Sequence, residues 1–157
     1  MTVWAACGLR EHHGVVSETC VFCAIARGEV AADIVWRDDV AVAFLDRSPL
    51  FHGHTLVVPL RHVLTLPDLL VDEVGPFFER VRMIAAAMPN ALGAQGTFVA
   101  NNNVVSQSVA HLHVHVVPRT RGDGLRGFFW PRHRYADGEA TQIADALRRE
   151  LEARSAR

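Results

Sequence analysis

The sequence predicts an α+β domain with a largely antiparallel β-sheet. Five short β-prone runs are present, and one long amphipathic helix separates the third run from the fourth. Helices and strands do not alternate regularly, as they would in a parallel sheet built from βαβ units. The chain has 157 residues, of which 50% are hydrophobic. That is enough to bury one compact core.

The first half of the chain is expected to form a short helix and three strands. The turn residues 37–39 separate the first two strands, and Gly53 precedes the third, which Pro59 closes. Trp36, in the first strand, is expected in the core. The predicted elements are a helix over Cys20–Arg27 and strands over Ile34–Trp36, Val40–Leu45 and His54–Val58.

The second half is expected to contain the long helix, two further strands and a final helix. In the long helix, apolar residues recur at steps of three and four and form one face. These residues are Val74, Phe77, Val81, Ile84 and Met88. The predicted elements are a helix over Val71–Met88 that Pro89 and Gly93 close, strands over Thr97–Ala100 and His111–Val117, and a helix over Gly138–Ala153.

The domain organisation follows from these elements. A single domain is predicted over residues 19–157, with a core over 20–119, a C-terminal extension over 120–157 and a flexible leader over 1–18. No run of 18 apolar residues occurs, so no membrane partner is expected. The N-terminus lacks the basic and apolar regions of a signal peptide, so a cytoplasmic location is expected. No organic cofactor is indicated.

The charge of the chain excludes several classes of function. The formal net charge is −1, so a broad basic surface for nucleic acid is not expected. Lysine is absent, and all 16 basic side chains are arginines. The chain therefore has no phosphate-binding lysine of the Walker type, no Schiff-base lysine and no lysine nucleophile.

Three histidines, His111, His113 and His115, alternate with apolar residues. On a strand, residues two apart share a face, so the three imidazoles are expected to point the same way. Three interpretations are open: an incidental polar face, a row of metal ligands, or nucleophilic catalysis in which one imidazole attacks and its neighbours fix its tautomer. Gln107 and Ser108 can hydrogen-bond phosphate oxygens and favour the third interpretation.

Three blocks of sequence, taken together, resemble the histidine-triad (HIT) family of nucleotide hydrolases and transferases. Residues 106–115, Ser-Gln-Ser-Val-Ala-His-Leu-His-Val-His, look like the family signature. Residues 19–29 resemble the start of the bacterial Hint-like branch, and residues 43–49 and 53–59 are similar to its second and third strands. The resemblance spans about residues 20–119. It implies a HIT-like sheet of about five antiparallel strands with helices packed on it, and a two-fold homodimer.

The resemblance also implies catalytic roles. His113 matches the nucleophile, which attacks the α-phosphate of a nucleotide. His115 matches the supporting third histidine, and His54 matches the histidine that backs it from the neighbouring strand. Ser108 and Gln107 match contacts to the phosphate and to the leaving group.

Further matches concern substrate binding. Asp46 matches the acid that binds the ribose hydroxyls, and Asn101 matches an asparagine on the phosphate or ribose side. The loop over 101–107 looks shorter than in the family and lacks its common glycines, so Asn102 and Asn103 remain alternatives for that role. The residues expected near the base are Phe44, Leu45 and Arg47.

The pair Cys20 and Cys23 has the spacing of zinc ligands, but two thiolates make only half of a tetrahedral site. His62 and His111 are the natural completions, and the resemblance implies the same four ligands for a structural zinc ion. The other interpretation is that both cysteines are small buried hydrophobic residues.

The function that the resemblance implies is hydrolysis at the α-phosphate of a purine nucleoside phosphoramidate, a nucleotidyl adduct or a dinucleoside polyphosphate, through a covalent nucleotidyl-histidine. The expected ligand is a purine nucleotide of the AMP or GMP type. Three alternatives stay open: a non-catalytic nucleotide-binding regulator, a dinucleoside polyphosphate phosphorylase or nucleotidyltransferase, and a zinc hydrolase with the triad as ligands. The aromatic segment Phe128–Trp130 either shapes the pocket or seals the edge of the sheet.

Overall fold

The computed structural model describes residues 20–125 and 134–155, with side chains up to residue 148. The predicted leader over 1–18 and the segment Phe128–Trp130 lie outside the described residues. The chain up to Arg121 belongs to one compact unit, and the chain from Gly122 belongs to a second, in which helix α3 spans Glu139–Ser155. Within the described residues, no helix is both long enough and apolar enough to cross a membrane.

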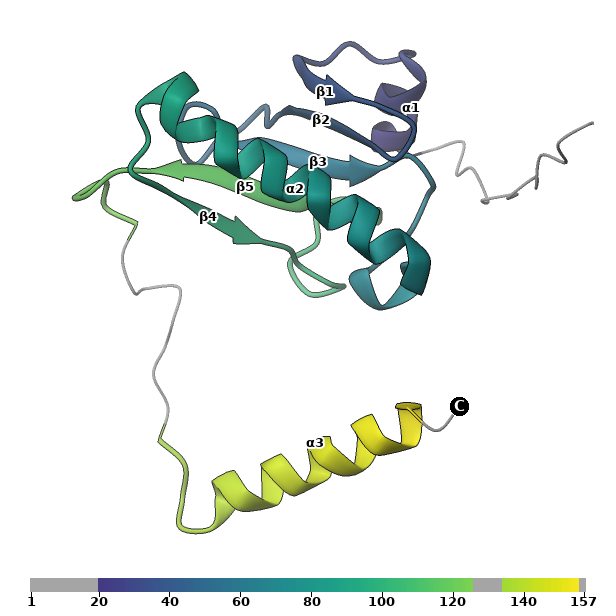
Figure 1. Ribbon diagram of the computed structural model, residues 1–157, viewed down its shortest axis with the longest axis vertical. Coiled ribbons are helices and arrows are strands. Elements are labelled where there is room, and N and C mark those ends of the chain that lie inside the picture. The colour runs from purple at the N-terminus through teal and green to yellow at the C-terminus, as the bar shows by residue number, and fades with distance from the viewer. Residues whose placement is uncertain (1–19, 126–133, 156–157) are drawn as a thin grey trace, which may run out of the picture. The chain divides into compact units, whose positions relative to one another are not determined.

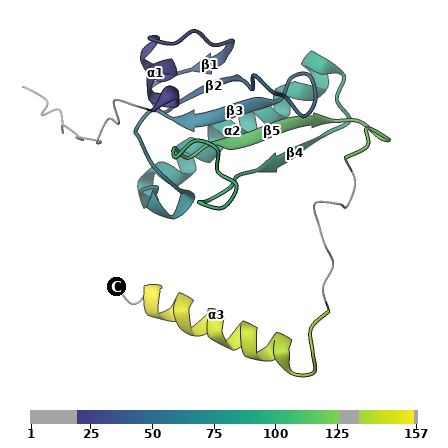
Figure 2. The same ribbon diagram turned by 180° about the vertical axis from the view of Figure 1, so that it is seen from behind.

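The first unit is built on a five-stranded sheet in the order β1-β2-β3-β5-β4 (Figures 1 and 2). All neighbouring strands are antiparallel. The α+β class and the five-stranded antiparallel sheet predicted from the sequence are therefore confirmed. The strands are β1 (Ile34–Arg37), β2 (Ala41–Leu45), β3 (Thr55–Pro59), β4 (Gly96–Ala100) and β5 (Val114–Arg119).

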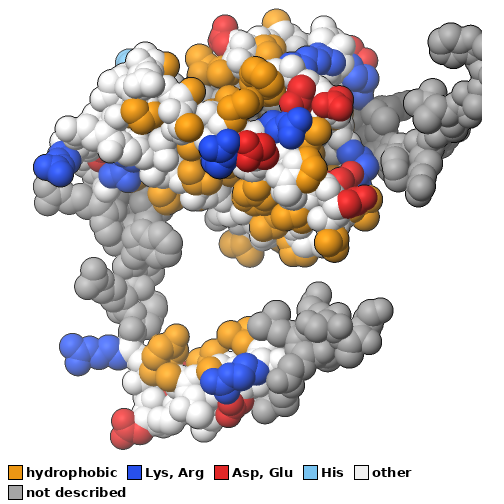
Figure 3. Space-filling model, viewed as in Figure 1, with side chains coloured by type: hydrophobic (Ala, Val, Ile, Leu, Met, Phe, Trp, Pro, Cys, Tyr) orange, Lys and Arg blue, Asp and Glu red, His pale blue; other side chains and the backbone are white. Residues whose placement is uncertain are grey.

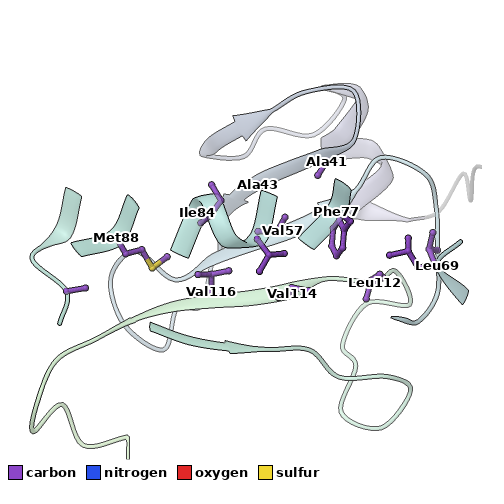
Figure 4. Close-up of a cluster of buried hydrophobic side chains, with 13 residues drawn as sticks. Ala41, Ala43, Val57, Leu69, Phe77, Ile84, Met88, Leu112, Val114 and Val116 are labelled. Carbon is purple, nitrogen blue, oxygen red and sulfur yellow. The ribbon is translucent and has the colours of Figure 1, made fainter. Parts of the chain in front are cut away.

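The central strands are apolar on both faces, because their alternating side chains pack against a helix on each side. Helix α2 (Val71–Leu92) covers one face, where Val57 and Val116 contact its buried residues (Figure 4). The short helix α1 (Val21–Arg27) packs on the other face against Phe44. Figure 1 shows α2 in front of the sheet, and Figure 2 shows the face that α2 leaves open.

Two predicted boundaries are wrong. The strand predicted from His111 begins only at Val114, because the preceding backbone makes local and cross-loop bonds instead: the His111 N–H donates to the Val109 carbonyl at 2.8 Å. The long helix continues through Pro89 to Leu92. The proline removes one hydrogen bond in the last turn, and the helix ends at Gly93, whose φ of 67° favours glycine.

The surface over α2 mixes apolar, basic and acidic side chains (Figure 3). Trp36, expected in the core, is 41% exposed on the outer strand β1. Its indole Nε1 donates to Asp38 at 3.2 Å, so its polar atom is satisfied at the surface. Arginines near α2 form ion pairs, namely Arg61–Glu73, Arg80–Asp38 and Arg82–Glu79.

Candidate active site and metal centre

A cavity of about 450 Å³ opens on the α1 side of the sheet. Its lining combines apolar side chains of α1, such as Phe22 and Ile25, with polar groups from β5 and the loop before it. It therefore offers an apolar wall and polar anchors, the usual make-up of a small-molecule site. The residues predicted for the site that line it are Phe44, Leu45, Asp46, Arg47, Ser108, His113 and His115.

Three residues predicted for the site do not line the cavity. His54 is 3% exposed and bonds to His115. The Asn101 side-chain amide donates to the Asn103 Oδ1 at 2.9 Å. Both amide atoms of Gln107 are engaged elsewhere, by the N–H of Val104 at 2.8 Å and by the carbonyl of Leu64 at 2.7 Å.

His113 lies immediately before β5 and is 2% exposed. Its Nδ1 donates to the His111 carbonyl at 2.7 Å. Because a carbonyl only accepts, the neutral ring carries its proton on Nδ1 and its lone pair on Nε2. Among the described residues, every buried side-chain N or O atom has a hydrogen-bond partner. Nδ1 is engaged by the bond to the His111 carbonyl, and the ring of His113 lines the cavity.

A chain of hydrogen bonds fixes the tautomer of His115. The backbone N–H of Leu50 donates to the Nδ1 of His54 at 3.2 Å, so the proton of the neutral His54 ring is on Nε2. That nitrogen lies 2.9 Å from the Nδ1 of His115 and donates to it. The proton of His115 is therefore on Nε2. His113 offers a lone pair and His115 offers an N–H donor, from rings whose centroids are 5.0 Å apart.

Burial keeps both supporting histidines neutral. It lowers the pKa of His115 to about 4, with smaller contributions from His113 and His54. Burial also lowers the pKa of His54, although the carboxylate of Asp46, 3.7 Å from its Nδ1, acts in the opposite direction. At neutral pH the hydrogen bond from His54 to His115, and with it the N–H donor on the His115 Nε2, is therefore maintained.

A second cluster brings together Cys20, Cys23, His62 and His111, whose potential ligand atoms all lie within 4.8 Å of one another. The Cys20 Sγ is 3.4 Å from the His111 Nδ1, and the Cys23 Sγ is 3.3 Å from the His62 Nδ1. Zinc bonds of about 2.3 Å to sulfur and about 2.0 Å to nitrogen would space tetrahedral ligands about 3.5 Å apart. The donor set and its spacing therefore fit one four-coordinate zinc ion.

The second ring nitrogen of His111 supports the same interpretation. Nε2 donates to the Pro59 carbonyl at 3.0 Å, which leaves the lone pair of Nδ1 facing the two thiols. Burial lowers the pKa of His111 to about 4, so its ring is in the deprotonated form that a metal requires. The carbonyl of this residue also accepts the Nδ1–H of His113, so one hydrogen bond joins the metal cluster to a residue that lines the cavity.

Sequence reasoning missed nine residues that line the cavity, and two of them, Phe22 and Leu56, lie next to the histidines. Phe22, inside the Cys-x-x-Cys segment, packs edge-on against His113 with ring centroids 5.2 Å apart. Leu56 pairs with His115 across β3 and β5 and lines the same cavity. The alternation of β3 could have identified Leu56, because it lies two residues after His54. No comparable signal marks Phe22, since the thiols dominate the interpretation of its segment.

A comparison with protein families shows to which family the chain belongs. The family model described as HIT domain matches residues 27–122. The chain belongs to the HIT family. An uncharacterised HIT-like protein of Methanocaldococcus jannaschii is 40% identical over 107 residues, which cover 67% of this chain and 82% of that protein. The adenylylsulfatase HINT3 of Arabidopsis thaliana is 34% identical over 140 residues, covering 84% and 69%.

Other matching HIT proteins include one that is named for an enzymatic activity and one whose structure contains zinc. The adenosine 5′-monophosphoramidase hnt1 of Schizosaccharomyces pombe is 25% identical over 131 residues, covering 82% of this chain and 96% of that protein. The SMU.412c structure from Streptococcus mutans matches with a TM-score of 0.80 and 32% identity, covering 92% of each chain. A Zn-bound histidine triad family protein from Mycobacterium smegmatis matches with a TM-score of 0.65 and 33% identity, covering 86% and 97%.

Proposed function

We propose that this HIT protein is a hydrolase that releases a purine nucleoside monophosphate from a phosphoramidate, a nucleotidyl adduct or a dinucleoside polyphosphate, with His113 as the nucleophile. The observation that carries the proposal is the lone pair of the His113 Nε2 beside the N–H donor of His115. The relatives named adenylylsulfatase and adenosine 5′-monophosphoramidase support this reaction class.

In the first step, the His113 Nε2 attacks the α-phosphorus. The new P–N bond forms as the bond to the leaving group breaks, and the leaving group departs with the bonding electrons. An amine leaving group takes a proton from solvent through the hydroxyl of Ser108, which lines the cavity. The His115 N–H donates to a phosphate oxygen, where negative charge is held in the transition state.

In the second step, water attacks the nucleotidyl-histidine. The P–N bond breaks, its electrons return to Nε2, and the proton of the water passes to solvent. While the phosphorus is attached, the ring of His113 is positively charged. The His111 carbonyl accepts its Nδ1–H at 2.7 Å and stabilises that charge.

The rest of the cavity is suited to the nucleoside. Phe22, Ile25 and Phe44 give an apolar wall on which a base can lie. Asp46 lines the same cavity, and its Oδ1 is held by the Ser48 N–H at 2.8 Å. This carboxylate is the acceptor proposed for the ribose hydroxyls.

We propose zinc as the resident metal of the cluster formed by Cys20, Cys23, His62 and His111, supported by the spacing of these ligands and by the Zn-bound relative. Bound zinc would supply a structural crosslink and no redox or hydrolytic chemistry. The crosslink would hold the His111 backbone, whose carbonyl fixes the tautomer of His113.

The test is a turnover panel with wild type and His113→Ala. The panel compares adenosine and guanosine phosphoramidates, adenylyl sulfate, and dinucleoside tri- and tetraphosphates, with acid-quench mass spectrometry for the covalent nucleotidyl adduct. His113→Ala should lose turnover by at least about 10³-fold and should show no adduct. AMP binding, measured by calorimetry, should survive in the variant.

Two results would contradict the proposal. Undiminished turnover by His113→Ala would reject the nucleophile. AMP binding by the wild type without turnover of any member of the panel would instead indicate a nucleotide-binding regulator.

A further inference from the structure

The loop between β4 and β5 contains two residues in an unfavourable backbone conformation. Val104 has a φ of 68° and Ser106 a φ of 61°, in the left-handed region that residues other than glycine rarely adopt. A β-branched residue such as Val104 is a clear outlier there. Its side chain is 76% exposed and that of Val105 is 78% exposed. Packing therefore does not hold this loop in shape.

Two amide side chains hold the loop instead. The Gln107 Oε1 accepts the backbone N–H of Val104 at 2.8 Å, at the strained position itself. The Asn103 Oδ1 accepts the backbone N–H of Leu66 at 2.9 Å and the side-chain N–H of Asn101 at 2.9 Å. Such side-chain bonds can stabilise a strained turn when the neighbouring structure is fixed.

The fixed structure is the segment His62–Leu66, which begins at a residue of the metal cluster. Leu64 accepts the Gln107 Nε2–H on its carbonyl at 2.7 Å. The Val63 carbonyl accepts the N–H of Leu112 at 2.6 Å. Leu112 lies between His111, which belongs to the metal cluster, and His113, which lines the cavity. The segment therefore starts at His62 and bonds to both amide side chains of the loop, to Gln107 through Leu64 and to Asn103 through Leu66.

We propose that Asn103 and Gln107 are positioning residues. They hold the strained loop 101–108 against the segment His62–Leu66, so that a metal ion bound by His62 also fixes Ser108 at the wall of the cavity. This inference rests on the proposed function for the role of Ser108. It assigns Gln107 a purpose different from the phosphate contact expected from the family, because both of its amide atoms bond within the protein.

The test measures hydrogen–deuterium exchange of the Val104 and Leu66 amides in the nucleotide-free, zinc-reconstituted protein. Gln107→Ala removes the acceptor of Val104, and Asn103→Ala removes the acceptor of Leu66. If the contacts form one unit, each substitution should accelerate exchange at both amides by at least about tenfold. Each substitution accelerating exchange only at its own amide would overturn the proposal.

Asn103→Asp is the matched control, because it retains the oxygen that accepts both bonds. It should leave exchange at both amides at the wild-type rate. Gln107→Glu keeps the acceptor for Val104 but loses the N–H donated to Leu64, so exchange at Leu66 should rise. If exchange at Leu66 in Gln107→Glu stays at the wild-type rate, the proposed link between Gln107 and the segment His62–Leu66 is overturned.

A metal arm and a kinetic arm complete the test. Chelating zinc from the wild type should accelerate exchange at Val104 and Leu66, and unchanged rates would overturn the coupling to the metal cluster. In Asn103→Ala, kcat for a phosphoramidate should fall about tenfold with KM within about twofold, and an unchanged kcat would overturn the role of the loop in positioning Ser108. The exchange measurements need no turnover, so they can fail or succeed independently of the proposed hydrolase activity.

Discussion

At the scale of single residues, the chemistry of the site depends on which ring nitrogen of each histidine carries the proton. His113 is set by a carbonyl two residues earlier, whereas His115 is set by His54, which is set in turn by the Leu50 backbone. One ring therefore offers a lone pair and the other an N–H donor. In the proposed reaction, the lone pair attacks the phosphorus and the N–H donor stabilises a phosphate oxygen.

Acid is expected to destabilise the fold through His115. Its folded pKa is lowered to about 4 by burial, while the unfolded chain titrates near about 6.5. Between these values the unfolded state binds more protons, so the free energy of unfolding falls as pH drops from about 6.5 to about 4. His54 shifts in the same direction. The contribution of His115 to the free energy of unfolding should be about 1 kcal/mol lower at pH 5 than at pH 7.5, a figure reduced because the side chain is partly exposed.

Urea unfolding of the zinc-loaded protein at the two pH values measures this difference. The control is His115→Gln, which cannot titrate. Its loss of stability between pH 7.5 and pH 5 should be smaller than that of the wild type. Equal losses in the two proteins would show that His115 is not responsible.

At the scale of elements, one carboxylate joins the turn between β1 and β2 to the long helix. Asp38 accepts the backbone N–H groups of Val40 and Ala41, both at 2.9 Å, and the Nε–H of Arg80 in α2 at 2.7 Å. These bonds hold the pKa of Asp38 far below its usual range, although burial opposes them.

Asp38→Ala should lower the free energy of unfolding by about 2–3 kcal/mol, because it removes the acceptor of two backbone N–H groups, of the Trp36 indole N–H and of the Arg80 Nε–H. Asp38→Asn retains an oxygen for the backbone donors but not the charge beside Arg80, and should cost less. Denaturant titration of both variants at pH 7 tests the order. A larger loss for Asp38→Asn than for Asp38→Ala would reject this account.

The apolar face of α2 is the second element whose stability can be predicted. Phe77 is 1% exposed in the core against the sheet (Figure 4). Phe77→Ala should cost about 3–5 kcal/mol through lost burial and a residual cavity. Val74 belongs to the same predicted stripe but is 38% exposed, so Val74→Ala should cost less than about 1 kcal/mol. Thermal or urea unfolding measures both losses of stability. Similar losses for Phe77→Ala and Val74→Ala would contradict this packing.

Periodicity predicted the elements well and the polar connections poorly. The apolar runs of β2 and β3 and the apolar stripe of α2 are set by burial, which a sequence pattern reports directly. By contrast, the alternation over 111–113 does not form a strand. There the His111 ring is held by the Pro59 carbonyl, and the His111 backbone bonds to Val109. A sequence pattern does not reveal such side-chain commitments.

The candidate site shows the same limit. Phe44 lies in β2 and Asp46 directly follows it, and the family resemblance named both in advance. Gln107 could be named as polar and near the triad, but its partner Leu64 lies 43 residues away in the chain. A bond between a side chain and a distant carbonyl depends on the packed fold and leaves no local pattern.

At the scale of the whole molecule, the metal cluster ties separate parts of the first unit together. Cys20 and Cys23 belong to α1 and its N-terminal cap, His62 follows β3, and His111 precedes β5. Helix α1 has only seven residues, too few to be stable alone. Its attachment therefore depends on packing and, with the proposed zinc bound, on the crosslink through Cys20 and Cys23.

Removing the metal should lower the stability of the whole unit. A zinc ion that binds only the folded state adds about 4 kcal/mol when its free concentration exceeds Kd by about a thousandfold. Chelation should therefore lower the melting temperature by several degrees, and elemental analysis should find about one zinc per chain before chelation. Cys20→Ser should show a lower melting temperature that chelation changes little. A melting temperature in the wild type that does not respond to chelation would reject a structural zinc.

The bond from the His113 ring to the His111 carbonyl spans only three residues, and this has an evolutionary consequence. The bond itself involves no side chain other than the ring of His113. The ring of His115, in contrast, depends on a partner 61 residues away. Mutational drift should therefore remove the N–H donor of His115 before the lone pair of His113, leaving descendants in which the proposed adduct forms more slowly.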